Sequence, residues 1–134
     1  MDDCVFCKII RKEIPALVVY EDTEFLSFME LLPSAPGQCM VIPKKHGRSM
    51  LDYEESTLGK LMPVIKIMAK KVQTALGCEH ITIGINHLEP TGVPHLHVHL
   101  IPRWGNDGGH AIQGVVKNLP TEPREIIAEK IRKA

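Results

Sequence analysis

Three histidines alternate with apolar residues in the segment His95-Leu-His97-Val-His99, and this spacing gathers titratable nitrogens in one place. On a β-strand alternate side chains share a face, so the three imidazoles are expected about 6.5–7 Å apart. Leu96 and Val98 would then point into the core. Three histidines on one face of so short a segment indicate a functional site rather than ordinary surface residues.

Two chemistries could use such a row of imidazoles. Histidine binds zinc when it is neutral, and alternate histidines of a strand can supply two or three ligands, as a zinc hydrolase would need. A neutral imidazole can instead attack an electrophile and be displaced later, which is covalent catalysis. A neighbouring histidine then donates a proton to the leaving group. The spacing alone does not decide between the two.

A second candidate site lies at the start of the chain, where Cys4 and Cys7 have the spacing of paired metal ligands. The four cysteines are too few, in a chain of 134 residues, for a disulfide scaffold. In a reducing compartment a Cys-x-x-Cys pair is a metal half-site or a free dithiol. A closed tetrahedral zinc site needs two further ligands.

The composition is that of an ordinary globular protein. A chain of 134 residues buries one core, so a single domain is expected over residues 1–134. Sixteen basic residues balance sixteen acidic ones, which argues against long nucleic acid and anionic membranes as partners. No apolar run is long enough to span a bilayer, and the acidic first residues are unlike a secretory signal. We therefore expect a cytoplasmic protein.

The elements that must position the histidines predict an α+β domain. Strand patterns and hairpin signals recur along the chain, and two segments have helical spacing of apolar residues. Hairpin connections favour an antiparallel sheet of about five strands, with one long helix and a C-terminal helix. The expected strands are 17–21, 24–29, 39–42, 80–85 and 95–101, and the helices are 58–76 and a segment after Pro123.

The histidine row resembles the motif of the histidine-triad (HIT) family of nucleotide hydrolases and transferases. Two further segments support the resemblance. Residues 4–15, Cys-Val-Phe-Cys-Lys-Ile-Ile-Arg-Lys-Glu-Ile-Pro, are similar to the family's N-terminal segment, and residues 41–46, Val-Ile-Pro-Lys-Lys-His, to its middle segment. The similarity covers roughly residues 4–103 and implies a HIT-like fold.

The resemblance implies a mechanism. His97 would attack the α-phosphorus of a nucleotide, such as a phosphoramidate or a dinucleoside polyphosphate, and form a nucleotidyl-histidine intermediate. His99 would hydrogen-bond the phosphate or leaving-group oxygen and assist proton transfer. His95 would support the array, with help from His46. Water would then release the nucleoside monophosphate. A protein that keeps the pocket as a nucleotide sensor, with little turnover, is the alternative from another class.

The resemblance also implies a nucleotide pocket. Phe28 and Leu31 would line the base and ribose, and Glu30, where many members have aspartate, would bind the ribose hydroxyls. Asn86 matches an asparagine on the ribose or phosphate side.

The phosphate end of this pocket departs from the family pattern. The segment 86–95 is about two residues shorter than in many members and lacks their glutamine. Thr91 and Gly92 remain as phosphate-side candidates, Arg103 would reach outer phosphates, and Trp104 would stack on a second base or on the leaving group.

The resemblance finally implies a metal and a partner. In members with the cysteine pair, the histidines matching His46 and His95 can complete a structural zinc site with Cys4 and Cys7. No organic cofactor is expected. Members of this size are commonly homodimers that pair through the long helix, here 58–76, and the neighbouring strand.

Overall fold

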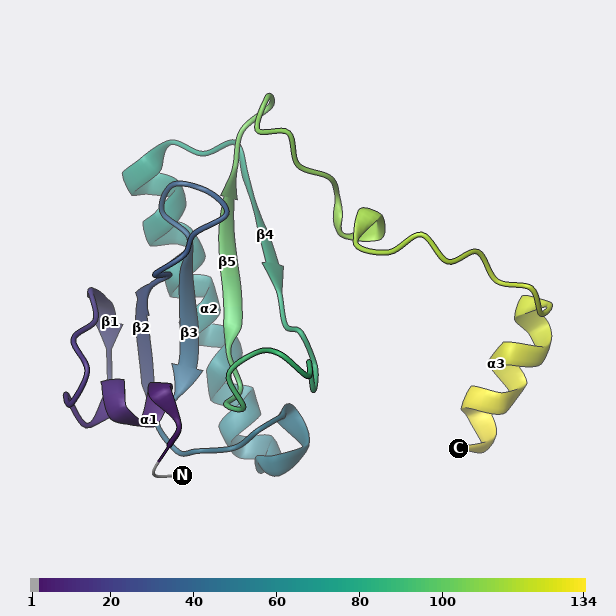
Figure 1. Cartoon of the computed structure of the whole chain (residues 1–134), viewed down its shortest axis with the longest axis horizontal. Helices are drawn as coiled ribbons and strands as arrows, with labels where there is room; N and C mark the ends of the chain where they lie inside the picture. Colours follow the sequence, from purple (N-terminus) through teal and green to yellow (C-terminus); the bar gives the residue numbers. More distant parts are fainter. Residues whose placement is uncertain (1–2) are drawn as a thin grey trace.

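The computed structural model describes residues 3–134 and contains a five-stranded antiparallel sheet with a long helix on one face (Figure 1). The strand order is β1-β2-β3-β5-β4, and every neighbouring pair is antiparallel. The predicted α+β class is therefore confirmed. The elements are α1 (Val5–Ile10), β1 (Val18–Glu21), β2 (Phe25–Met29), β3 (Cys39–Pro43), α2 (Glu55–Leu76), β4 (His80–Gly84), β5 (Val98–Arg103) and α3 (Arg124–Lys133), with short 3-10 turns at Met50–Asp52 and Ile112–Gly114.

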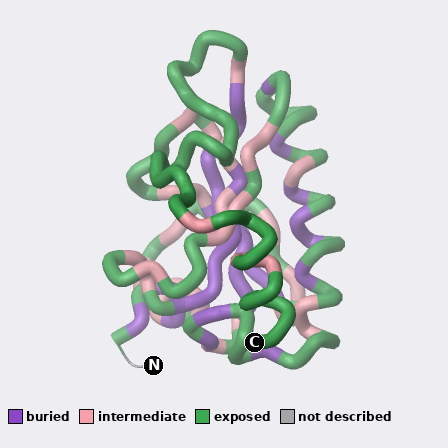
Figure 2. Tube along the Cα trace, turned by 90° about the vertical axis from the view of Figure 1, so that its right-hand side faces the viewer, coloured by how far each residue is buried: buried purple, intermediate pink, exposed green. Residues whose placement is uncertain are grey.

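Helix α2 covers one face of the sheet. It begins at Glu55 and continues through Pro63, which cannot donate a backbone hydrogen bond. The packing of the apolar stripe on the strands stabilises the helix by more than the missing hydrogen bond costs. The buried stripe and exposed face of α2 alternate visibly in Figure 2. Gly77, at a φ of 62°, ends the helix in the left-handed conformation that glycine adopts without strain. The buried side chains of the stripe are Leu61, Val64, Ile65, Met68 and Val72.

The opposite face of the sheet carries α1 and a second, smaller core. Period-2 alternation sends Phe25, Cys39 and Val41 toward α2, whereas Leu26, Phe28, Met40 and Ile42 pack with the residues of α1. Cys4, Phe6 and Cys7 belong to this smaller core. The N-terminal segment is thus held against the face on which the histidines lie.

Strand β5 starts at Val98, three residues later than the expected start at His95. The pair Val41↔Val98 is the last between β3 and β5 on this side. Two residues before Val98, the Leu96 N–H donates to the Gly47 carbonyl at 2.7 Å. The segment before β5 is therefore hydrogen-bonded to the loop after β3 and not to β3 itself. The imidazoles of His97 and His99 meet edge to face, with ring centroids 4.9 Å apart.

The predicted C-terminal helix is present as α3, but it stands away from the sheet at the end of an extended segment (Figure 1). None of its residues is buried. Among the described residues, no helix combines the length and the apolar character that a membrane crossing requires.

Candidate active site and metal centre

His97 is held in one tautomer by the backbone. Its Nδ1 lies 2.6 Å from the carbonyl oxygen of His95, and because a carbonyl only accepts, Nδ1 carries the proton. In the neutral ring the other nitrogen, Nε2, then has no proton and keeps a free lone pair. The side chain is 8% exposed. This arrangement gives a nucleophilic nitrogen with a fixed direction.

His99 is held in the opposite tautomer by Gln38. The backbone N–H of Ser34 donates to Oε1 of Gln38 at 2.7 Å, which fixes the orientation of the amide. The amide nitrogen Nε2 of Gln38 therefore faces Nδ1 of His99, 3.3 Å away, and donates to it. The proton of the neutral His99 ring must then sit on Nε2. Burial, with a smaller contribution from His97, lowers the pKa of His99, so this ring is neutral near pH 7 in the free protein.

Phe6 joins the triad to the smaller core. Its ring meets His97 edge to face at a centroid distance of 5.3 Å, and it meets His95 at 5.9 Å and Phe28 at 5.4 Å in the same manner. Such pairs each add about 0.5–1.5 kcal/mol beyond the burial of their area. Phe6 thus limits the movement of the His97 ring from the side of α1.

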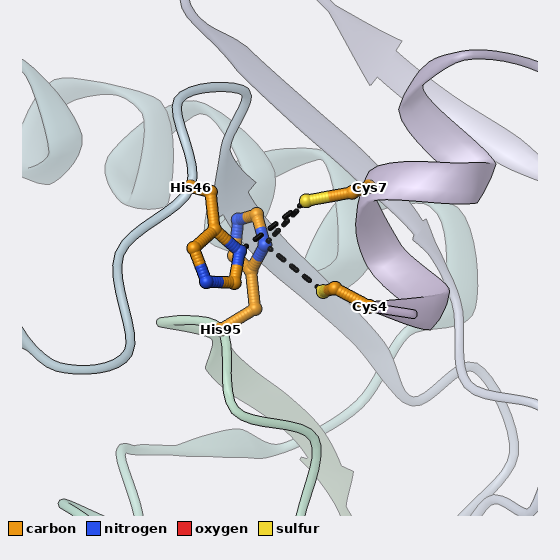
Figure 3. Close-up of side chains that lie close together, drawn as sticks. All are labelled: Cys4, Cys7, His46 and His95. Carbon is orange, nitrogen blue, oxygen red and sulfur yellow. Dashed lines mark hydrogen bonds between the residues drawn. The ribbon is translucent and has the colours of Figure 1, made fainter. Parts of the chain in front are cut away.

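Four potential metal ligands converge beside the triad (Figure 3): Cys4, Cys7, His46 and His95. Their ligand atoms all lie within 4.8 Å of one another. Nδ1 of His95 is 3.6 Å from the sulfur of each cysteine, and Nδ1 of His46 is 3.3 Å from the sulfur of Cys7. The four residues are the predicted metal ligands, and the fold brings them together.

The spacing of these atoms suits a tetrahedral zinc ion. Ideal Zn–S and Zn–N bonds at tetrahedral angles put a sulfur and a nitrogen ligand about 3.5 Å apart. The three sulfur–nitrogen distances, 3.3, 3.6 and 3.6 Å, bracket that value. Nε2 of His95 donates to the Pro43 carbonyl at 2.8 Å, which leaves Nδ1 unprotonated and orients the ring as a metal-binding histidine is usually oriented.

The charge state of His95 agrees with metal binding, whereas the Cys7 thiol has to lose its proton when a metal binds. Burial lowers the pKa of His95 to about 4, so the ring is in the neutral form that binds metal at neutral pH. Burial and the neighbouring Cys4 raise the pKa of the Cys7 thiol. Two close buried thiolates need a cation to be stable, and zinc supplies that charge. Of the three triad histidines only His95 belongs to the cluster, so the row does not act as one metal site.

A small cleft opens in front of His97 between the loop 85–94 and residues 48–49. Glu89 projects from this loop, and its Oε1 lies 3.7 Å from Nε2 of His97. Gly92 packs directly against the Glu89 side chain, and a methyl group at this glycine would overlap the carboxylate. Leu88, the residue before Glu89, has a φ of 56°, a strained conformation for leucine. The loop therefore places a carboxylate beside Nε2 of His97.

The predicted nucleotide-binding residues occupy different surroundings. Phe28 is buried in the smaller core against Phe6, rather than open to solvent. Glu30 accepts the N–H groups of residues 31 and 32, and its charge acts on His99. Leu31 is 88% exposed. Asn86 lines the cleft in front of His97, together with Glu89.

Other predicted contacts lie away from the triad. Arg103 is at the opposite end of β5, where it bonds the Asp107 carboxylate, the Thr82 hydroxyl and the His110 carbonyl. Trp104 packs on the main core. The structure does not bring these two residues to the triad. Thr91 is an exposed residue of the loop, and Gly92 supports Glu89.

Three residues near the triad lack a signal in the sequence that singles them out: Phe6, Gln38 and Glu89. Phe6 stands between the two cysteines, and Gln38 stands just before β3. Their contacts with the histidines depend on the packing of distant segments. A buried glutamine, only 4% exposed, is the kind of residue that demands a hydrogen-bonding partner.

Comparison with known proteins agrees with this site. The HIT domain model matches residues 11–115. An uncharacterized HIT-like protein of Borreliella burgdorferi is 38% identical over 130 residues, covering 91% of each chain. Adenosine 5'-monophosphoramidase hnt1 of Schizosaccharomyces pombe is 30% identical over 127 residues, covering 93% of this chain and 91% of that protein. The crystal structure of a zinc-bound histidine triad family protein from Mycobacterium smegmatis superimposes with a TM-score of 0.75. The two sequences are 31% identical, and the match covers 80% of this chain and 79% of that protein.

The family model matches most of the chain, and the relatives span nearly its whole length. The five-stranded antiparallel sheet with its helices matches the fold of the similar solved structure. The chain therefore belongs to the HIT domain family.

Proposed function

We propose that the protein is a nucleotide hydrolase or transferase that cleaves a nucleoside α-phosphoryl bond through a nucleotidyl-His97 intermediate. The observation that carries the proposal is the tautomer of His97: the His95 carbonyl holds the proton on Nδ1, which leaves the lone pair of Nε2 free in the neutral ring, and His97 lines the cleft. The S. pombe relative is named an adenosine 5'-monophosphoramidase, which supports nucleoside phosphoramidates as one substrate class. Dinucleoside polyphosphates are the other.

In the first step, Nε2 of His97 forms a bond to the α-phosphorus while the bond to the leaving group breaks. The imidazole gains positive charge, which the carbonyl of His95 stabilises through the Nδ1–H bond. In the second step, water attacks the phosphorus, one of its protons passes to solvent, and His97 leaves as neutral imidazole. The product is a nucleoside monophosphate, and both steps use imidazole as nucleophile and leaving group.

The proton transfer that the resemblance implies for His99 stays a prediction, and the tautomer of its neutral ring supports a second role. A neutral imidazole whose Nδ1 is occupied by Gln38 has one proton, on Nε2, and keeps it. We propose that this N–H hydrogen-bonds a phosphoryl or leaving-group oxygen and stabilises the charge that develops there. A phosphate leaving group needs no proton, and an amine that is protonated before cleavage brings its own.

Zinc has a structural role in this proposal. Cys4, Cys7, His46 and His95 would hold the ion, and its charge would fix the N-terminal segment against the triad. The similar M. smegmatis protein is described as zinc-bound, which supports the assignment. His97 and His99 stay outside the ligand set and remain free for nucleotide chemistry.

Homodimer formation and a cytoplasmic location remain predictions. Two surfaces are available for a dimer of the expected kind. The side of α2 that faces away from the sheet exposes Met62 and Ile67, and β4 is an edge strand that exposes Ile83. Sedimentation of the purified chain tests the prediction of a homodimer.

The proposed function is tested by a comparison of turnover with binding. The full chain is incubated with adenosine 5'-phosphoramidate and with a dinucleoside polyphosphate, and AMP release is measured. Hydrolysis of either substrate that His97→Ala abolishes supports the proposal. Tight binding of AMP without AMP release from either substrate would instead identify a nucleotide sensor.

A further inference from the structure

Glu89 places a negative charge where a substrate that is itself negative must bind. Its Oε1 is 3.7 Å from Nε2 of His97, and its side chain is 29% exposed, so water only partly screens the carboxylate. The attacking nitrogen and the phosphorus approach to about 3–3.5 Å before reaction. The phosphoryl oxygens therefore come within a few ångströms of the Glu89 carboxylate, and the leaving group, on the far side of the phosphorus, stays within range of its partly screened charge.

The loop holds Glu89 in this place by its own construction. Gly92 leaves the space that the Glu89 side chain fills, since any Cβ at this position would overlap it. Its neighbour Leu88 adopts a φ of 56°. Both features lie in the short segment between Asn86 and the first triad histidine, one on each side of Glu89.

We propose that Glu89 determines the specificity of the site, favouring substrates whose leaving group is an amine over substrates whose leaving group is a phosphate. This inference rests on the proposed function and names the preferred substrate class. An amine leaving group has N–H donors and carries positive charge when protonated, and the carboxylate accepts from it. A polyphosphate leaving group has only negative oxygens, which the carboxylate repels.

The chemical step is balanced without a proton from Glu89. The P–N nitrogen first takes up a proton from solvent. Nε2 of His97 then forms its bond to phosphorus as the P–N bond of the protonated phosphoramidate breaks. The nitrogen leaves with the electron pair of that bond, as a neutral amine. The carboxylate acts before and during this step, by attracting the protonated nitrogen.

The test compares kcat/KM for adenosine 5'-phosphoramidate with kcat/KM for a diadenosine polyphosphate, in the wild-type chain and in Glu89→Gln. The substitution keeps the shape of the side chain and removes its charge. We expect the preference for the phosphoramidate to fall about tenfold, mainly through a lower KM for the polyphosphate. Glu79→Gln is the control, because Glu79 directly precedes β4, at the end of the strand away from the triad, and accepts the Gly105 N–H. It should leave the ratio unchanged.

A second variant moves the carboxylate without removing it. In Gly92→Ala the new methyl group displaces the flexible Glu89 side chain, so the preference should shift in the same direction as in Glu89→Gln. Binding of AMP gives a readout that needs no turnover: Glu89→Gln should bind AMP several-fold more tightly and bind uncharged adenosine equally.

The outcomes separate this inference from the proposed function. If the wild type hydrolyses the substrates but Glu89→Gln changes their ratio by less than twofold, the specificity role is wrong and the proposed function stands. If the wild type hydrolyses neither substrate, the proposed function fails. In that case the role of Glu89 is judged from AMP binding alone. Equal affinities of the wild type and Glu89→Gln for AMP would overturn it.

Discussion

Removal of the metal should weaken the fold by an amount that the ligand cluster makes predictable. Cys7 contacts both histidines of the cluster, with its sulfur 3.3 Å from His46 and 3.6 Å from His95. An ion that binds only the folded chain, at a free concentration one hundred times its Kd, raises the free energy of unfolding by about 2.7 kcal/mol. For a domain of 134 residues this corresponds to an increase in Tm of about 8–12 °C.

The assay is thermal unfolding of chelator-treated protein with and without added zinc, together with the metal content of protein purified without chelator. Cys7→Ser should lose most of the zinc-dependent increase in Tm. Cys78→Ser is the matched control, since Cys78 is also a buried thiol but belongs to the core under α2. It should have a lower Tm and keep the zinc-dependent increase. A wild-type Tm that does not respond to zinc, with metal content near zero, would refute the assignment.

Two further predictions concern the residues that hold the triad. Gln38→Leu removes the donor to His99 and should reduce kcat about ten- to a hundredfold with little change in KM. The kcat of the wild type should stay level from about pH 7 to 8. Burial lowers the pKa of His99, so its ring is already neutral in this range. Loss of wild-type activity as the pH rises through 7 would show instead that a charged His99 is needed. Phe6→Ala leaves a cavity beside His97 and should reduce the free energy of unfolding by about 3–5 kcal/mol, measured by urea denaturation. A reduction below about 1 kcal/mol would contradict the packing described for this ring.

The sequence predicts the fold class and the histidine site because both depend on local patterns. Strand alternation and the amphipathic stripe of α2 are periodic, so they are visible in a single chain. The cysteine spacing alone predicts half of a metal site, the resemblance to the HIT family implies His46 and His95 as the other two ligands, and the fold brings the four together.

The details that set the chemistry depend on contacts between distant segments. The start of β5 at Val98 follows from the loop after β3, which takes over the hydrogen bond of Leu96. Gln38 is separated from His99 by 61 positions, and only the register of β3 with β5 brings the two together. A pattern within one strand contains neither fact.

Charged residues are the hardest to assign from the chain alone. Arg103 follows the triad in sequence and invites a role with phosphate, but its nearest partner is Asp107, and the pair closes the turn after β5. Glu89 carries no motif, and it lies beside His97 only because of the shape of its loop. A charge acts on what is near it in space, and sequence order does not specify this.

The central claim, that Nε2 of His97 is the nucleophile, is tested most directly by trapping the intermediate. The full chain is mixed briefly with adenosine 5'-phosphoramidate, quenched with base, and mapped by mass spectrometry of its peptides. The structure predicts one added AMP moiety on His97, which His97→Ala abolishes with a loss of turnover of at least about a thousandfold. His80→Ala, an exposed histidine at the far end of β4, should form the adduct normally. An adduct on another residue, or turnover that survives in His97→Ala, would contradict the claim.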